Sequence, residues 1–85
     1  MRKSDMERLS RRIHTMPEDV EQALEQRGLM AAYNQRPPYQ RNDYIGWIIR
    51  AKRPDTRHRR LEQMLFELEQ GHLYMKMSWR RGRRG

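Results

Sequence analysis

Two helical patterns that meet at Pro54 constrain this chain more than any other feature. Between Tyr44 and Gly71, apolar residues recur every three or four positions on both sides of the proline, which is the spacing of one face of an α-helix. They are Tyr44, Ile45, Ile48 and Ala51 before the proline, and Leu61, Met64, Leu65 and Leu68 after it. Because proline has a fixed φ and no N–H, Pro54 ends the first helix and opens the second. We therefore predict two helices that share one apolar face, with Gly71 ending the second.

The first of these two helices is expected to run from near Pro38 to about Arg53. Gly46 lies inside it and costs about 1 kcal/mol relative to alanine, so we expect another element to approach the backbone there. Trp47 lies at the margin of the apolar arc. It either completes the core or forms an exposed aromatic platform beside Arg50, and the sequence leaves both interpretations open.

A third helix is predicted over residues 17–27. Thr15 and Glu18 fit a capping box, in which Thr15 caps the helix and Glu18 reaches back to it. Gly28 supplies the stop, because a left-handed residue commonly ends a helix. The inward face consists of Val20, Ala23 and Leu24. A short helix or turn follows and ends before Pro37, since proline disfavours the helical conformation of the residue that precedes it.

The length of the chain limits its architecture. Eighty-five residues allow one domain, and a chain this short buries only about 60% of the surface that its unfolded form exposes. The predicted fold is therefore all-α: a small single-domain bundle of three to four helices. We expect a basic N-terminal arm over residues 1–14, the helical domain over residues 15–78 and a disordered basic C-terminal tail over residues 79–85.

The segment that follows Gly71 is ambiguous. The residues from His72 to Trp79 alternate weakly between apolar and polar, as a strand does. A lone strand would have no partner in an all-helical chain. We therefore expect Leu73, Tyr74 and Met75 to fold back over the helices instead.

The net charge of +8 is unevenly distributed along the chain. Residues 36–60 hold eight basic and two acidic side chains, whereas residues 17–35 hold one basic and four acidic ones. Such segregation places a basic patch beside an acidic helix, and a basic patch steers anionic partners. A charged surface that serves only solubility is the alternative.

No constellation of residues predicts catalysis or a cofactor. The chain has no cysteine, and no serine or threonine has a histidine at a spacing that suggests a catalytic pair. The three histidines are far apart in the sequence. His58 and Glu62 lie four positions apart, and a surface pair on one helix face explains them, so we expect no metal site. No apolar run is long enough for a signal peptide or a membrane span, which predicts a soluble, cytoplasmic protein that is not an enzyme.

The turn around Pro54 is the strongest candidate for a binding site. Its residues are Lys52, Arg53, Thr56, Arg57 and Arg60, with Trp47 nearby. A helix that begins here directs free backbone amides outward beside guanidinium groups, and both favour a phosphate or a carboxylate. In the alternative interpretation, Arg53 and Arg57 are structural and Thr56 is a local cap. The acidic partners would then be Glu18, Asp19 or Asp43.

The segment from Arg36 to Gly71 also carries a pattern of polar and aromatic residues that is specific to one family. The matching residues are Arg41, Tyr44, Trp47, Ile48, Ala51, Lys52, Arg53, Pro54, Thr56, Arg57, Arg59 and Arg60. On these residues, and on residues 16–24 before them, the chain resembles the YdeI/OmpD-associated family over about residues 13–71. This family is a small helical domain that is also called the bacteriocin-protection domain. The resemblance implies a bacterial accessory protein and names no chemistry.

Taken together, the sequence predicts a non-enzymatic bacterial accessory or interaction module. Its binding face is expected at the Lys52–Arg60 corner, and its partner is an unidentified protein or an anionic ligand. The alternative is a small basic nucleic-acid-binding protein. It would be driven by Arg36, Arg41, Arg50, Lys52, Arg53, Arg57, Arg59, Arg60 and the arginine-rich tail. Salt separates the two, because phosphate-driven binding weakens steeply with salt, whereas a packed protein interface depends mainly on an apolar anchor.

Overall fold

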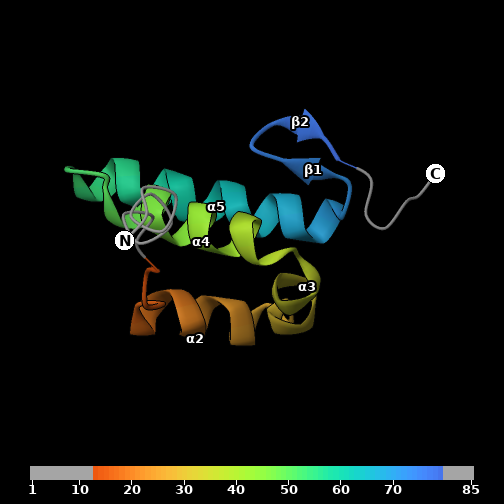
Figure 1. Ribbon diagram of the computed structural model, residues 1–85. Helices are drawn as coiled ribbons and strands as arrows, with labels where there is room; N and C mark the ends of the chain where they lie inside the picture. The colour runs from red at the N-terminus through yellow and green to blue at the C-terminus, as the bar shows by residue number, and fades with distance from the viewer. Residues whose placement is uncertain (1–12, 80–85) are drawn as a thin grey trace, which may run out of the picture.

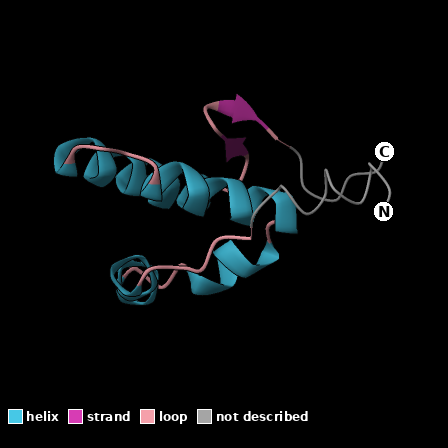
Figure 2. Cartoon of the chain, turned by 60° about the vertical axis from the view of Figure 1, so that its left-hand side comes forward, coloured by secondary structure: helices cyan, strands magenta, loops and turns pink. Residues whose placement is uncertain are grey.

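The computed structural model describes residues 13–79, which form four helices and one small β-hairpin. The elements are α2 (Glu18–Gln26), α3 (Met30–Gln35), α4 (Pro38–Ile49), α5 (Pro54–Gln70), β1 (Leu73–Tyr74) and β2 (Met77–Ser78). Helices α4 and α5 lie side by side, and α2 and the hairpin lie on opposite sides of this pair (Figures 1 and 2). The mostly helical prediction is confirmed. The predicted arm and tail lie outside the described residues, apart from Ile13, His14 and Trp79.

The core is built from one apolar face of each helix. Its buried residues are Val20 and Leu24, Leu29 and Tyr33, Tyr44, Ile45 and Ile48, and Leu61, Met64, Leu65 and Leu68. The four apolar residues predicted after Pro54 are therefore all buried, and burying a side chain of this size contributes about 1.5–3 kcal/mol. Ala51 is only partly buried, because α4 has already ended before it.

The end of α2 follows the predicted pattern, whereas its beginning does not. Gly28 adopts a φ of +68°, and the Leu29 N–H donates to the Leu24 carbonyl at 2.8 Å, so the predicted glycine stop is confirmed. The predicted capping box is wrong. The N-cap residue is Pro17, and no side chain caps this helix. The Pro17 carbonyl instead accepts the N–H groups of the first turn at 3.1 Å.

Helix α4 ends at Ile49, earlier than the predicted end near Arg53. The physical reason lies at Pro54, which forces the residue before it into extended backbone. Arg53 accordingly has a ψ of 144° and serves as the N-cap of α5, so the chain needs a few residues to leave one helix and enter the next. As predicted, Pro54 opens α5, and Gly71 ends it with a φ of +80°.

The backbone of α4 is approached closely at Gly46, as predicted. The ring of His14 lies so near that a Cβ atom at this position would be 2.6 Å from its Nε2. The His14 backbone N–H also donates to Asn42 Oδ1 at 2.7 Å. The segment before α2 is therefore attached to α4 at two points one turn apart.

The segment after Gly71 corrects the prediction that it contains no strand. β1 and β2 pair antiparallel, with Leu73 opposite Ser78 and Tyr74 opposite Met77. The first strand thus pairs with the residues that directly follow it in the chain. The two turn residues, Met75 and Lys76, have φ of 51° and 66°, the left-handed conformation that a two-residue hairpin requires. Tyr74 and Met75 do pack against the helical core, as expected.

The hairpin is attached to the helices by a buried carboxylate, that of Glu67 on α5. The side chain is 1% exposed. Its oxygens accept the N–H groups of Met75 and Lys76, both at 2.8 Å, the Tyr44 hydroxyl at 2.5 Å and the Gln63 amide at 3.0 Å. Burial, together with the hydrogen bond to Glu67, raises the pKa of Tyr44 well above its ordinary value.

A buried arginine also contacts Glu67, through its backbone carbonyl. Arg36, which is 4% exposed, donates to the Glu67 backbone carbonyl at 3.0 Å and to Gln40 Oε1 at 3.1 Å. Its guanidinium group lies 4.7 Å from the centre of the Trp79 ring. Trp79 was predicted to begin the disordered tail, yet this contact and a 2.8 Å hydrogen bond from its N–H to the His72 carbonyl attach it to the domain.

We expect Leu65→Ala to lower the free energy of unfolding by about 2–5 kcal/mol, because the side chain is fully buried in the core and its truncation leaves a cavity. Urea denaturation measures the change. The matched control is Phe66→Ala on the next position of α5, where the side chain is 53% exposed and the loss should stay much smaller. Equal losses for the two variants would contradict the assigned core face.

We expect Glu67→Gln to lower the free energy of unfolding by about 1–3 kcal/mol, because one acceptor oxygen becomes a donor that faces other donors. Amide hydrogen exchange should accelerate most at Met75 and Lys76. The control is Glu69→Gln, which changes an exposed carboxylate on the same helix. Unchanged exchange at the two turn residues would show that the carboxylate does not hold the hairpin.

Candidate binding surface on α4 and α5

Two arginines of the predicted corner are engaged by carboxylates. Arg57 reaches from α5 to α2, where Nη1 lies 2.6 Å from Asp19 Oδ2 and Nη2 lies 3.3 Å from Oδ1. Arg53 Nε donates to Asp55 Oδ1 at 3.2 Å, and the same oxygen accepts the Thr56 N–H. The Arg57 contact is the one that the structural interpretation predicted, whereas Arg53 pairs with Asp55, which was not among the expected partners.

These contacts set the protonation of both carboxyl groups. The hydrogen bond from Arg57 holds the pKa of Asp19 below its ordinary value of 3.8. The hydrogen bond from Arg53 does the same to the pKa of Asp55. Both carboxylates therefore stay charged through the neutral range. Each neutralises part of the positive charge that the sequence places at this corner.

Trp47 and Arg60 form a separate unit. Arg60 Nη1 donates to the Trp47 backbone carbonyl at 2.6 Å, and its guanidinium carbon lies 5.3 Å from the centre of the indole ring. The hydrogen bond fixes the arginine over the aromatic face, which is the arrangement that a cation and an indole favour. Trp47 is partly buried and packs against the core cluster, so it contributes to the core and also contacts this arginine.

Trp47 and Arg60 line an open hollow of about 600 Å³, which we call the Trp47–Phe66 groove. Its lining residues are Trp47, Thr56, His58, Arg59, Arg60, Glu62, Gln63, Phe66 and Lys76. Most of them come from one face of α5, while Trp47 comes from α4 and Lys76 from the hairpin turn. Phe66 contributes a large aromatic side chain that is about half exposed.

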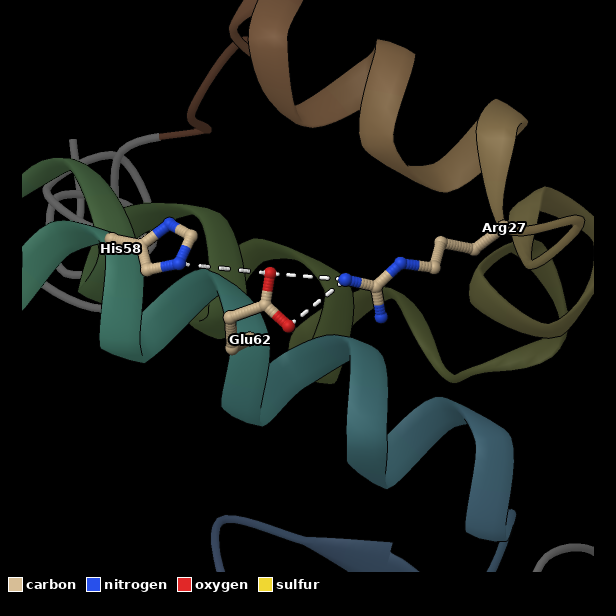
Figure 3. A network of polar contacts seen from close by, with 3 residues as sticks. All are labelled: Arg27, His58 and Glu62. Atoms are coloured by element: carbon tan, nitrogen blue, oxygen red, sulfur yellow. Dashed lines mark hydrogen bonds and ion pairs between the residues drawn. The ribbon is translucent and has the colours of Figure 1, made fainter.

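The groove is cationic because its acidic residue is already paired. Glu62 accepts two hydrogen bonds from Arg27 Nη2, at 2.9 and 3.0 Å, and lies 3.9 Å from His58 Nε2. Figure 3 shows this carboxylate between the histidine on α5 and the arginine at the end of α2. Arg59, Arg60 and Lys76 line the groove, Glu62 is held by a residue outside it, and Arg59 Nη1 also lies 4.0 Å from Asp55 Oδ2.

The structure thus divides the predicted site. Trp47, Thr56 and Arg60 share one groove, whereas Lys52, Arg53 and Arg57 do not line it. Sequence reasoning missed Phe66, Gln63 and Arg59 as groove residues, although they recur with Thr56 at helical spacing and could have been found from it. Lys76 carried no such signal, because its position depends on the hairpin.

Within residues 13–79, no helix is long and apolar enough to cross a membrane. In the same part of the chain, no group of three or more His, Cys, Asp or Glu side chains is arranged to hold a metal ion.

Comparison with known proteins gives one match. A family model described as "Bacteriocin-protection, YdeI or OmpD-Associated" matches residues 14–71, which is more than half of the chain and contains α2 to α5. No curated protein and no solved structure matches the chain.

The Arg57–Asp19 pair should make a small, pH-dependent contribution to stability. Because the folded-state pKa of Asp19 is lowered, the stabilisation is present above about pH 4 and is lost as the pH falls through that lowered value. More than half of the Asp19 side chain is exposed, so we expect Arg57→Ala to cost about 0.2–1 kcal/mol near neutrality and almost nothing near pH 2.

Urea denaturation at a series of pH values measures this difference. Lys52→Ala is the control, since it removes an exposed cation from the same corner. A cost for Arg57→Ala that is independent of pH would show that the ion pair is not its cause.

Proposed function

Because the chain belongs to the bacteriocin-protection, or YdeI/OmpD-associated, family, we propose that it is a non-enzymatic accessory module of the bacterial cytoplasm that acts by binding another protein. The Trp47–Phe66 groove is the proposed binding surface. Its partner is an acidic segment that carries an apolar side chain. The family description itself names an association, which favours a protein partner over a reaction.

The observation that carries this proposal is the combination of two aromatic rings with three cations in one hollow. Phe66 lies on a helix whose opposite positions are buried in the core, yet about half of its side chain is exposed in the hollow that Trp47 also lines. Exposed aromatic residues at the centre of a concave surface, surrounded by polar groups, are typical of the residues that dominate binding energy at interfaces.

The charges around the groove specify the kind of partner. Arg59, Arg60 and Lys76 line it, and the Glu62 carboxylate is engaged by Arg27. A segment that brings acidic residues would be attracted over several ångströms and oriented as it docks. Arg60 is held in place by its hydrogen bond to Trp47, so little conformational entropy is lost when it pairs with an incoming carboxylate.

Nucleic acid is the second candidate and is less well supported. Three of the arginines on which that interpretation depends are engaged within the domain: Arg36 is buried, Arg53 pairs with Asp55 and Arg57 pairs with Asp19. Arg36 is therefore withdrawn from solvent, whereas Arg53 and Arg57 would have to exchange a carboxylate for a phosphate. The high net charge is therefore a poor measure of affinity for nucleic acid in this chain.

Backbone amide NMR titrations test the proposal with two probes, an acidic peptide that carries a central leucine and a short DNA duplex, each at two salt concentrations. We expect the peptide to shift resonances around Trp47, Arg60 and Phe66 and to keep much of its affinity at the higher salt. Phe66→Ala should weaken peptide binding about 10-fold, since it removes the aromatic anchor. Ile49→Ala, an exposed apolar residue outside the groove, is the control and should change nothing.

Two results would contradict the proposal. In the first, the peptide shifts are diffuse, vanish at the higher salt and ignore Phe66→Ala. In the second, the DNA duplex binds more tightly than the peptide and its affinity falls steeply with salt, which would favour the nucleic-acid alternative.

A further inference from the structure

A second hollow lies at the elbow between α3 and α4 and shares no lining residue with the Trp47–Phe66 groove. We call it the elbow cavity; its volume is about 570 Å³. Its walls are largely apolar and aromatic, formed by Ile13, Tyr33, Pro38 and Tyr39. The volume falls in the range of about 300–1,000 Å³ that is typical of sites for small molecules.

Arg41 lines the elbow cavity together with the polar residues His14 and Asn42. Its side chain is partly buried, and its Nε is fully buried without a hydrogen-bond partner among residues 13–79. Other arginines of this domain have partners: Arg27 and Arg57 bind carboxylates, and Arg36 binds two carbonyl oxygens. Because this nitrogen is covered by the protein, a ligand in the cavity meets the other atoms of the Arg41 side chain, which lines the wall.

The residues around Arg41 hold the cavity in shape. The His14 backbone N–H donates to Asn42 Oδ1, and the His14 ring lies against Gly46, which fixes one wall to α4. The Tyr39 hydroxyl accepts from the Gln40 amide at 3.1 Å, and its ring meets the Tyr74 ring edge-on with centroids 5.9 Å apart. These contacts hold His14 and Tyr39, two of the lining residues, in place.

Among residues 13–79, the residues that line the cavity include no carboxylate to balance the charge of Arg41. The complementary ligand is an anion, and a guanidinium group binds a carboxylate through two parallel hydrogen bonds. The apolar walls require that the anion also has an apolar body, because an inorganic ion would leave them in contact with water. Both requirements apply to the same small molecule.

We propose that the elbow cavity binds a small organic anion, in which a carboxylate pairs with Arg41 and an aromatic or other apolar body lies between Tyr33, Pro38 and Tyr39. This site is independent of the groove proposed for the protein partner. The domain would then carry one surface for a protein and a separate cavity for a small molecule.

Phenylacetate is the probe for the test, with acetate and phenylacetamide as its matched controls. Acetate keeps the charge without the ring, and phenylacetamide keeps the ring without the charge. In NMR titrations we expect phenylacetate to give saturable shifts at His14, Tyr33, Tyr39 and Arg41. Each control should bind at least about 10-fold more weakly, since a charge-assisted hydrogen bond or a buried ring is worth that factor.

Arg41→Gln should weaken phenylacetate binding at least about 10-fold and should not lower the melting temperature, because it removes a buried Nε that has no hydrogen-bond partner among the described residues. Arg59→Gln, which changes an exposed arginine of the groove, is the control and should bind phenylacetate as the unmodified chain does. Arg41→Lys keeps the charge without the planar fork, and we expect an intermediate affinity.

Three results would overturn the proposal. Phenylacetamide could bind as tightly as phenylacetate, which would show that the charge of Arg41 has no role in binding. Arg41→Gln could bind as well as the unmodified chain. The shifts could also spread over all exposed arginines without saturating, which would mean that phenylacetate meets only a charged surface. If Arg41→Gln unfolds the domain, the affinity of Arg41→Lys decides, and full retention of affinity there would contradict the two-bond geometry.

Discussion

The buried carboxylate of Glu67 is the interaction on which the rest of this small domain depends. A charge on the inward side of α5 is costly unless donors surround it, and here the donors come from three places: Tyr44 on α4, Gln63 on α5 itself and the two amides of the hairpin turn. Arg36 adds a bond to the backbone carbonyl of the same residue. One position of α5 thus connects the end of α3, the middle of α4 and the hairpin.

This arrangement links the fold to the proposed binding surface. Each strand of the hairpin contains only two residues, and an isolated two-stranded hairpin of this size has little stability of its own. Its turn contains no glycine or asparagine to favour left-handed backbone, so both strained residues depend on the carboxylate that accepts their N–H groups. Lys76 is one of these two residues, and it lines the Trp47–Phe66 groove. The position of Lys76 in the groove therefore depends on the buried carboxylate of Glu67.

The sequence was sufficient to predict those features that depend only on neighbouring residues. Pro54, Gly28 and Gly71 mark helix ends because their backbone preferences act within a few residues, and the period of α5 identified its core face. The hairpin could not be predicted, since Met75 and Lys76 are poor turn residues and their support comes from Glu67, which looks like an ordinary surface residue in the sequence. The same distinction holds for the site. Trp47, Thr56 and Arg60 were found from neighbouring residues. The pairs of Arg27 with Glu62 and of Arg57 with Asp19 join residues more than 30 positions apart and could not be read from local spacing.

The distribution of those contacts changes what the net charge of +8 means. A simple count treats every arginine as an available cation, but the described domain uses them in four ways. Arg36 is buried as a donor to backbone and amide oxygens, and Arg27 and Arg57 join α5 to α2 through carboxylates. Arg59 and Arg60 line an aromatic groove, and Arg41 lies in a cavity with a buried nitrogen that has no partner among the described residues. Only the last two uses leave charge for a ligand, and both combine it with apolar surface. A domain built this way is suited to partners that bring an anion and an apolar group together, which a bare phosphate backbone does not.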